Sequence, residues 1–180
     1  MSNMKAVLFD LDGTLLPMDQ DEFVKAYFGL LAKRLAPLGY EPGKLQKVFW
    51  AGVGAMVKND GSCTNEEAFW KVFLAAYGED ALKDKPYIDE FYKNEFNKVQ
   101  AVCGYAISAK AVIEQVKEKG YVCILATNPL FPHTATENRI RWAGLQPEDF
   151  VLYTTYENCH YCKPNPKYYE EILRNGRKNV

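Results

Sequence analysis

The sequence of 180 residues has little histidine and no excess of charge of either sign. It contains two histidines, 22 basic residues and 23 acidic residues, which gives a formal net charge of −1. A nucleic-acid-binding surface needs a clustered basic excess, so this balance argues against nucleic acid as a partner. No apolar run approaches the roughly 20 residues of a membrane span, and the short apolar run near the N-terminus is interrupted by Asp10, unlike a signal peptide. We expect a cytoplasmic protein with no membrane partner.

The cysteines are few and do not indicate a disulfide framework, because the five of them are an odd number scattered along the chain. Residues 159–162 read Cys-His-Tyr-Cys, a spacing for which zinc is conceivable. A structural zinc site needs four ligands, however, and no second pair stands nearby. We interpret these residues as thiols in a loop, Cys123 as a small hydrophobe, and the other cysteines as free thiols of a reducing compartment.

The most informative segment present is AVLFDLDGTLL at residues 6–16. Its four leading apolar residues predict a short buried strand that places Asp10 and Asp12 at its carboxyl end, before a turn at Gly13. Ligands of open α/β sheets bind at this edge. Two adjacent carboxylates repel each other, so a cation or a proton on one of them must offset the repulsion. An Asp-rich turn is the simpler alternative, but strand, acids, glycine and threonine together favour chemistry.

The stretch from residue 17 to residue 101 has helical spacing of its apolar residues and no convincing strand. A capping box of Thr64 and Glu67 predicts the start of one helix, which ends at Gly78. The predicted helices cover residues 19–36, 43–58, 65–77 and 86–98. Aromatic residues of this stretch, including Trp50, Trp70 and Phe73, sit at helical spacing, and we interpret them as core residues rather than as substrate contacts.

From residue 102 onward the sequence alternates between helical and strand patterns. Helices are predicted over residues 108–119, 134–143 and 166–175, and strands over residues 121–126 and 150–153. The first of these two strands is a continuous apolar run, typical of a strand buried on both faces. The alternation predicts an α/β fold, a Rossmann-like parallel sheet flanked by helices on both faces.

Two short motifs follow these strands. Thr127-Asn128-Pro129 comes directly after residues 121–126, and Lys163-Pro164-Asn165-Pro166 comes after the last strand, with Pro166 suited to the first turn of a helix. Alone, the first is an ordinary turn and the second a solvated lysine in a proline-rich loop. In order behind Asp10 and Asp12, the three segments resemble motifs I, II and III of the haloacid dehalogenase superfamily, and the resemblance covers nearly the whole chain.

This resemblance implies a core formed by residues 1–16 and 102–180, and an inserted all-α cap of the C1 type formed by residues 17–101, which closes over the site. It implies an Mg²⁺-dependent phosphatase of small phosphorylated metabolites. Asp10 would form an aspartyl phosphate and Asp12 would act as general acid and base, while the Asp10 carboxylate and the Asp12 backbone carbonyl bind Mg²⁺. Thr127, Asn128 and Lys163 would hold the phosphate oxygens.

One part of the family pattern is missing, namely the later strand with Gly-Asp or Gly-Asn whose acids complete the Mg²⁺ site. In the family that strand pairs with the first one, so residues 6–9 are expected to form an edge open to pairing. We expect either that the 180 residues belong to a longer protein or that a second copy covers the edge in a homodimer. The alternatives to a phosphatase are a phosphomutase, which uses the same residues, and a truncated binding module without catalysis.

Overall fold

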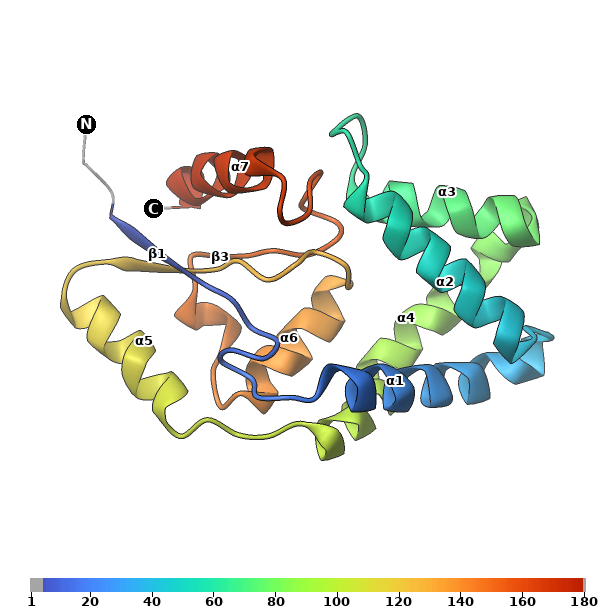
Figure 1. Ribbon diagram of the computed structural model, residues 1–180, viewed down its shortest axis with the longest axis horizontal. Helices are drawn as coiled ribbons and strands as arrows, with labels where there is room; N and C mark the ends of the chain where they lie inside the picture. The colour runs from blue at the N-terminus through green and yellow to red at the C-terminus, as the bar shows by residue number, and fades with distance from the viewer. Residues whose placement is uncertain (1–4, 180) are drawn as a thin grey trace.

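The structure, a computed structural model, describes residues 5–179, and residues 1–4 and 180 of the predicted core lie outside the described residues. A sheet with its helices forms one part of the molecule, and a group of helices lies beside it (Figure 1). The strands are β1 (Ala6–Phe9), β2 (Val122–Leu125) and β3 (Leu152–Tyr153). They are parallel in the order β1-β2-β3. The predicted α/β class is therefore confirmed.

Helices cover both faces of the sheet because neighbouring residues of β2 point in opposite directions. Ile124 packs against Ile172 of α7 (Pro166–Gly176), which covers one face. Cys123 and Leu125 belong to the larger core on the other face, together with residues of α5 (Ser108–Glu118) and α6 (His133–Trp142). The predicted two-sided burial of this strand holds for its last three residues.

Strand β1 lies at an edge, since among the described residues it pairs with β2 alone. Its four residues are only half-buried. The prediction of a buried strand is thus wrong in degree, because a strand with one neighbour leaves its other side uncovered. The expected open edge is present.

Between Asp19 and Cys103 the described chain contains helices and turns but no strand. The two segments that connect this helical part to the sheet run side by side, because Gly104 N donates to Pro17 O at 2.7 Å and Met18 forms a bridge with Cys103. The elements are α1 (Gln20–Leu35), η1 (Ala36–Leu38), α2 (Pro42–Val57), α3 (Asn65–Tyr77), η2 (Glu79–Asp84), α4 (Lys85–Lys93) and η3 (Glu95–Val102). No described helix of the chain is both long and apolar enough to cross a bilayer.

Local hydrogen bonds explain where these helices begin and end. The predicted capping box is present: Glu67 N donates to Thr64 Oγ1 at 3.2 Å, and Thr64 N donates to Glu67 Oε2 at 2.8 Å. The predicted helix 86–98 is wrong beyond Lys93. Asn94 leaves the helical region, with φ −113° and ψ −83°, and its side chain donates to Glu90 O at 3.0 Å. Such a side-chain bond competes with the helix, and the chain continues as a 3₁₀ helix.

Candidate active site

Asp10 and Asp12 stand at the carboxyl end of β1, as the sequence predicts. The loop that follows is tight, because Gly13 N donates to Leu16 O and Leu16 N donates to Leu11 O, both at 2.9 Å. Gly13 has φ +78°, a conformation that favours glycine. The turn holds both carboxyl groups at the same edge of the sheet.

The Asp10 carboxylate has two partners. Lys163 Nζ donates to Asp10 Oδ1 at 2.8 Å, and Thr14 Oγ1 donates to Asp10 Oδ2 at 3.2 Å. Lys163 lies 153 residues along the chain from Asp10, and the fold brings the two together. Lys163 thus gives Asp10 a cationic partner, which offsets part of the repulsion between the two acids.

Asp12 has a cation of its own, which the sequence analysis missed. Arg139 Nη1 of α6 donates to Asp12 Oδ2, and the Arg139 side chain is fully buried. Its Nε donates to Ala135 O and its Nη2 to Thr136 Oγ1, each at 3.3 Å, and the guanidinium lies 4.4 Å from the centre of the Phe131 ring. These contacts fix the guanidinium in one orientation.

The second carboxyl oxygen of Asp12, Oδ1, is buried and has no hydrogen-bond partner among the described residues. A buried acceptor without a partner is costly, so it marks a place where a proton or a ligand belongs. The Asp12 carboxyl is thus held firmly at one oxygen and open at the other.

A signal for Arg139 does exist in the sequence. The buried face of α6 includes Ala135, Thr136 and Ile140, and Arg139 falls on that same face. Charged side chains are almost never fully buried unless they are paired. A charge at an apolar position of a helix therefore predicts a buried acid, but the sequence does not say which one.

The residues of the second and third motifs meet in the same region. Thr127 is buried, and its carbonyl accepts 2.6 Å bonds from Thr154 Oγ1 and from Tyr168 OH. Asn128 Oδ1 accepts from Lys163 N at 3.1 Å, which joins the loop after β2 to the loop that carries the lysine. Phosphate binding by Thr127, Asn128 and Lys163 stays a prediction.

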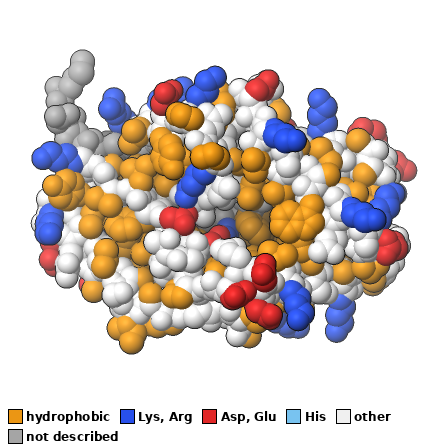
Figure 2. Space-filling model, in the orientation of Figure 1, with side chains coloured by type: hydrophobic (Ala, Val, Ile, Leu, Met, Phe, Trp, Pro, Cys, Tyr) orange, Lys and Arg blue, Asp and Glu red, His pale blue; other side chains and the backbone are white. Residues whose placement is uncertain are grey.

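A cavity of about 410 Å³ lies between the sheet and the helical part. Asp10, Asp12, Asn128 and Lys163 line it, whereas Thr127 is not among its lining residues. Hydrophobic side chains border the hollow on the face of the molecule in Figure 2.

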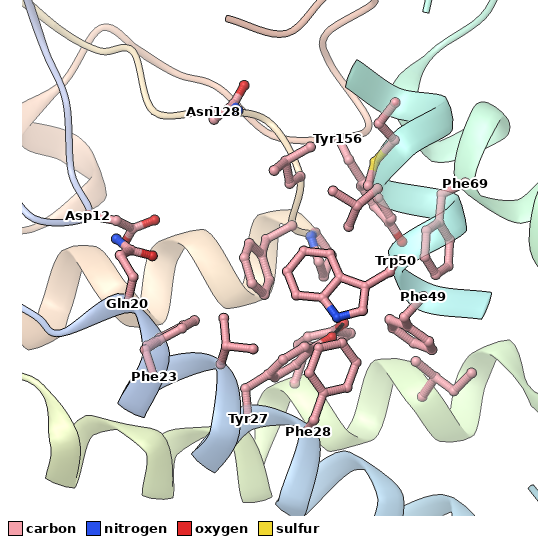
Figure 3. A pocket seen from close by; sticks show the side chains of 18 of the residues that line it. Asp12, Gln20, Phe23, Tyr27, Phe28, Phe49, Trp50, Phe69, Asn128 and Tyr156 are labelled. Atoms are coloured by element: carbon pink, nitrogen blue, oxygen red, sulfur yellow. Dashed lines mark hydrogen bonds between the residues drawn. The ribbon is translucent and has the colours of Figure 1, made fainter. Parts of the chain in front are cut away.

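The far wall of this cavity corrects the interpretation of Trp50 as a core residue. Phe73 and Trp70 are buried in the core, as predicted, although Trp70 also lines the cavity. Trp50 lines the cavity and is 49% exposed. Figure 3 shows Trp50 beside Phe28 and Phe49, across the cavity from Asp12.

The donor atoms at the charged end suit Mg²⁺, which prefers oxygen ligands and keeps several waters. The Asp10 carboxylate and the Asp12 backbone carbonyl are such ligands. Within residues 5–179, no group of three or more His, Cys, Asp or Glu residues is placed to hold a metal ion, so a third acid is not present there.

At Cys159 and Cys162, too, no group of three or more possible metal ligands is found among the described residues. Both cysteines lie in the loop before α7, and none of the five cysteines forms a disulfide. His160, between them, pairs through Nδ1 with Glu171 Oε1 at 2.6 Å instead.

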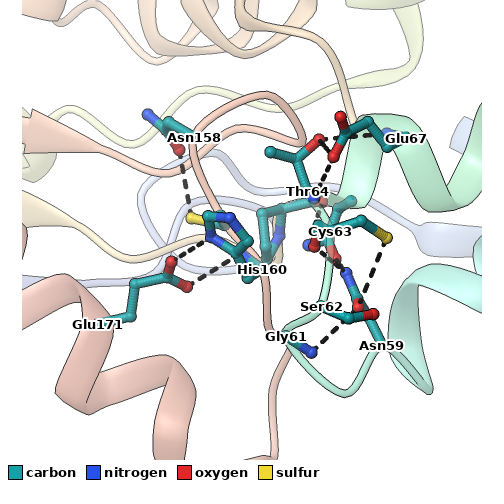
Figure 4. Close-up of polar contacts among 12 residues, drawn as sticks. Asn59, Gly61, Ser62, Cys63, Thr64, Glu67, Asn158, His160 and Glu171 are labelled. Carbon is teal, nitrogen blue, oxygen red and sulfur yellow. Dashed lines mark hydrogen bonds and ion pairs between the residues drawn. The ribbon is translucent and has the colours of Figure 1, made fainter.

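The helical part contacts the loops of the site through the start of α3. Asn65 is fully buried; its N donates to Cys159 O at 2.9 Å, and its Nδ2 lies 3.3 Å from Pro129 O and 3.4 Å from Cys162 Sγ. Figure 4 shows the turn before α3 beside His160 and Asn158. Gly61 of this turn lies so close to Tyr161 that a Cβ would come within 2.0 Å of the tyrosine hydroxyl.

Comparisons with known proteins bear on the family and the fold of the chain. The family model described as "Hydrolase: haloacid dehalogenase-like hydrolase" matches residues 4–176. A HAD phosphatase from Thermococcus onnurineus is similar in structure, with a TM-score of 0.51 and 20% identity over 96% of this chain and 71% of that one. This likeness supports the fold alone.

Two further solved structures match with a TM-score of 0.49 each. One is a protein assigned as a β-phosphoglucomutase from Thermotoga maritima, 22% identical over 97% of this chain and 71% of that one. The other is a HAD family enzyme from Bacteroides thetaiotaomicron, 17% identical over 97% of this chain and 79% of that one. No curated protein sequence matches the chain.

Proposed function

Because the chain belongs to the family of haloacid dehalogenase-like hydrolases, we propose that it is an Mg²⁺-dependent phosphatase of small phosphorylated metabolites. The observation that carries the proposal is that the two acids have different cationic partners and line the same cavity. Asp10 is held by Lys163, Asp12 is held separately by Arg139, and both acids face one cavity. A nucleophile and a proton donor with separate partners can act in one reaction.

In the first step, a carboxylate oxygen of Asp10 attacks the phosphorus atom and forms an aspartyl phosphate. The bond between phosphorus and the leaving oxygen breaks, and its electron pair stays on that oxygen. Asp12 gives the leaving oxygen a proton from Oδ1, the atom without a partner. The product alcohol leaves, and Asp12 remains as the carboxylate.

In the second step, a water molecule attacks the phosphorus of the aspartyl phosphate. Asp12 takes a proton from this water, and the bond between phosphorus and Asp10 breaks. Inorganic phosphate leaves, Asp10 is again a carboxylate and Asp12 is again protonated. Arg139 keeps the Asp12 carboxyl in place through both proton transfers, since its contact is with the other oxygen.

The charges at the site call for a cation in addition to the protein's own. With Asp12 protonated, the Asp10 carboxylate and the two basic side chains sum to +1, whereas a phosphate monoester brings two negative charges, so the loaded site is left with a net negative charge. Mg²⁺ bound by Asp10 and by the Asp12 carbonyl would neutralise that charge at the phosphate oxygens. Lys163 and Asn128 orient the phosphate from the opposite loop.

Phosphate release from a panel of phosphorylated metabolites, with and without Mg²⁺, tests the proposal. We expect release that depends on Mg²⁺ and is lost with EDTA. Transfer of the phosphate to another position of the same substrate, without release, would indicate a phosphomutase. The absence of both reactions across the panel would overturn the proposal in favour of a binding module.

A further inference from the structure

The cavity has two chemically different ends. All the charged side chains that line it among the described residues, Asp10, Asp12 and Lys163, come from the sheet side. The helices α1 to α4 contribute mainly aromatic and aliphatic side chains and a single amide, that of Gln20. Gln20 lies next to Asp12, at the charged end (Figure 3).

The rings of the far end pack against one another rather than against polar groups. The centre of the Phe28 ring lies 6.0 Å from that of Phe49 and 5.9 Å from that of Trp50. The centres of Tyr27 and Phe131 are 5.5 Å apart. Contacts of this kind form an apolar wall across α1, α2 and the loop before α6.

Two hydroxyls on this wall are engaged with each other, since those of Tyr27 and Tyr92 bond at 2.7 Å in a buried position. The indole Nε1 of Trp70 is buried and has no hydrogen-bond partner among the described residues, so this wall keeps an N–H donor there for a substrate acceptor. A substrate hydroxyl placed here would lose its water and find few partners, which is unfavourable. An apolar group placed here would leave water at no such cost.

The exposure of Trp50 is an independent observation in favour of ligand binding at the apolar wall. It is a large aromatic residue that lies 49% exposed at the cavity, whereas Trp70 on the neighbouring helix is buried. A half-exposed tryptophan at a cavity gains burial when an apolar ligand enters.

We propose that the group esterified to the phosphate is apolar and ring-bearing, and that sugar and polyol phosphates are poor substrates. This inference rests on the proposed function, and it specifies the substrate class of that same site. The phosphate would lie at the end formed by Asp10 and Lys163, and the ring of the substrate would lie against Trp50 and Phe28.

The test compares benzyl phosphate with glucose 6-phosphate. Both are esters of primary alcohols and carry a six-membered ring, but the ring of benzyl phosphate is aromatic and apolar, whereas that of glucose 6-phosphate is saturated, contains an oxygen and carries hydroxyl groups. We expect kcat/KM for benzyl phosphate to exceed that for glucose 6-phosphate at least about tenfold, the order expected of a hydrophobic pocket. Equal values, or a preference for glucose 6-phosphate, would overturn the proposal while leaving the phosphatase activity in place.

Substitutions test whether the preference for benzyl phosphate comes from the apolar wall of the cavity. Trp50→Ala should lower kcat/KM for benzyl phosphate about tenfold and change that for glucose 6-phosphate less than twofold. Tyr169→Ala is the matched control, since Tyr169 is 42% exposed on α7 and does not line the cavity. It should change neither value. An equal loss on both substrates in Trp50→Ala would overturn the assignment.

Binding without turnover separates this inference from the proposed function. In EDTA, calorimetry should show that benzyl phosphate binds at least about tenfold more tightly than glucose 6-phosphate, and that Trp50→Ala removes the difference. Selective binding without hydrolysis would overturn the proposed phosphatase activity and support the apolar site. Hydrolysis without selective binding would support the phosphatase activity and overturn the apolar site.

Discussion

The two walls of the cavity differ in what holds them and in what they offer a ligand. On the sheet side, charged groups are fixed by contacts between residues far apart in sequence, such as Lys163 with Asp10 and Arg139 with Asp12. On the helical side, rings such as Phe28, Phe49 and Trp50 pack together and offer apolar surface. On the function proposed above, the chemistry would take place at the sheet side and the helical side would select the substrate. Substitutions on the two walls should therefore have separable effects.

The largest expected effect is that of Asp10→Asn. Loss of a nucleophile should lower kcat by about 10⁴-fold or more, and by the same factor on every substrate. The binding of benzyl phosphate in EDTA should not weaken, because the apolar wall is intact and the variant removes a negative charge beside the phosphate. Phosphate release and calorimetry measure the two effects.

Asp21→Asn is the control for this variant, since Asp21 is exposed in the first turn of α1 and lies away from the cavity. Its kcat should match that of the wild type. A tenth of the wild-type activity remaining in Asp10→Asn would contradict the assignment of the nucleophile.

Arg139→Met should affect both chemistry and stability. Removing one partner of a buried pair leaves the other uncompensated, so we expect a loss of about 3 kcal/mol in the free energy of unfolding. Because Asp12 loses its support, kcat should fall about 100-fold while KM stays within about twofold. Urea unfolding and steady-state kinetics provide the measurements.

Arg141→Met on the same helix is the matched control, because Arg141 is 47% exposed and pairs with Glu137 at the surface. It should change stability by less than about 0.5 kcal/mol. Arg139→Lys should recover part of kcat if the arginine positions Asp12 by its charge. An unchanged kcat in Arg139→Met would show that Arg139 has no role in the reaction.

Thr64→Ala tests whether the helical side can be destabilised without lowering kcat. Loss of this helix cap should lower the free energy of unfolding by about 1 kcal/mol, with kcat within about twofold of the wild type. Ser108→Ala is the control, since Ser108 begins α5 and is not its cap. A large fall in kcat in Thr64→Ala would show that the two walls are not separable.

The smallest expected effect is a loss of stability at alkaline pH. Burial, and to a lesser extent the nearby Asp12, raises the pKa of the Cys103 thiol to about 11. Between about pH 9 and pH 11, the folded state therefore keeps a proton that the unfolded chain releases. The stability of the folded state is unaffected by this thiol below about pH 9 and falls as the pH rises toward 11. The loss per thiol cannot exceed about 1.4 kcal/mol per pH unit, and the half-buried Cys103 should contribute a fraction of that.

Urea unfolding at pH 8 and at pH 10 measures this difference. Cys103→Ala should lose less stability between the two pH values than the wild type does. An identical pH dependence in both proteins would remove Cys103 from the explanation.

Much of the fold could be predicted from the sequence, because local patterns decide it. The capping box at Thr64 and Glu67 and the apolar run of β2 involve neighbouring residues, and each appears where it was predicted. The break at Asn94 was missed, because a single side-chain bond to the backbone outweighs the helical spacing around it.

The site could be predicted in part. The motifs identified Asp10 and Lys163, and the fold joins them. Arg139 could not be assigned a role, since it belongs to none of the motifs and its contact with Asp12, 127 residues away, arises only in the fold. Trp50 was misread for a similar reason: helical spacing shows that a residue lies on one face of a helix, but not whether that face meets a core or a cavity.

The contacts of Asn65 have a mechanical consequence. Its side chain is fixed to the loop after Asn128 and to the loop before Lys163. The helical part is held at other points as well, since Glu66 N donates to Tyr156 O and Asn138 Nδ2 donates to Tyr92 O. A displacement at the start of α3 would nevertheless reach Asn128 and Lys163 directly, because Asn65 contacts both of their loops. We therefore expect a ligand that shifts α3 to alter the position of Lys163 as well.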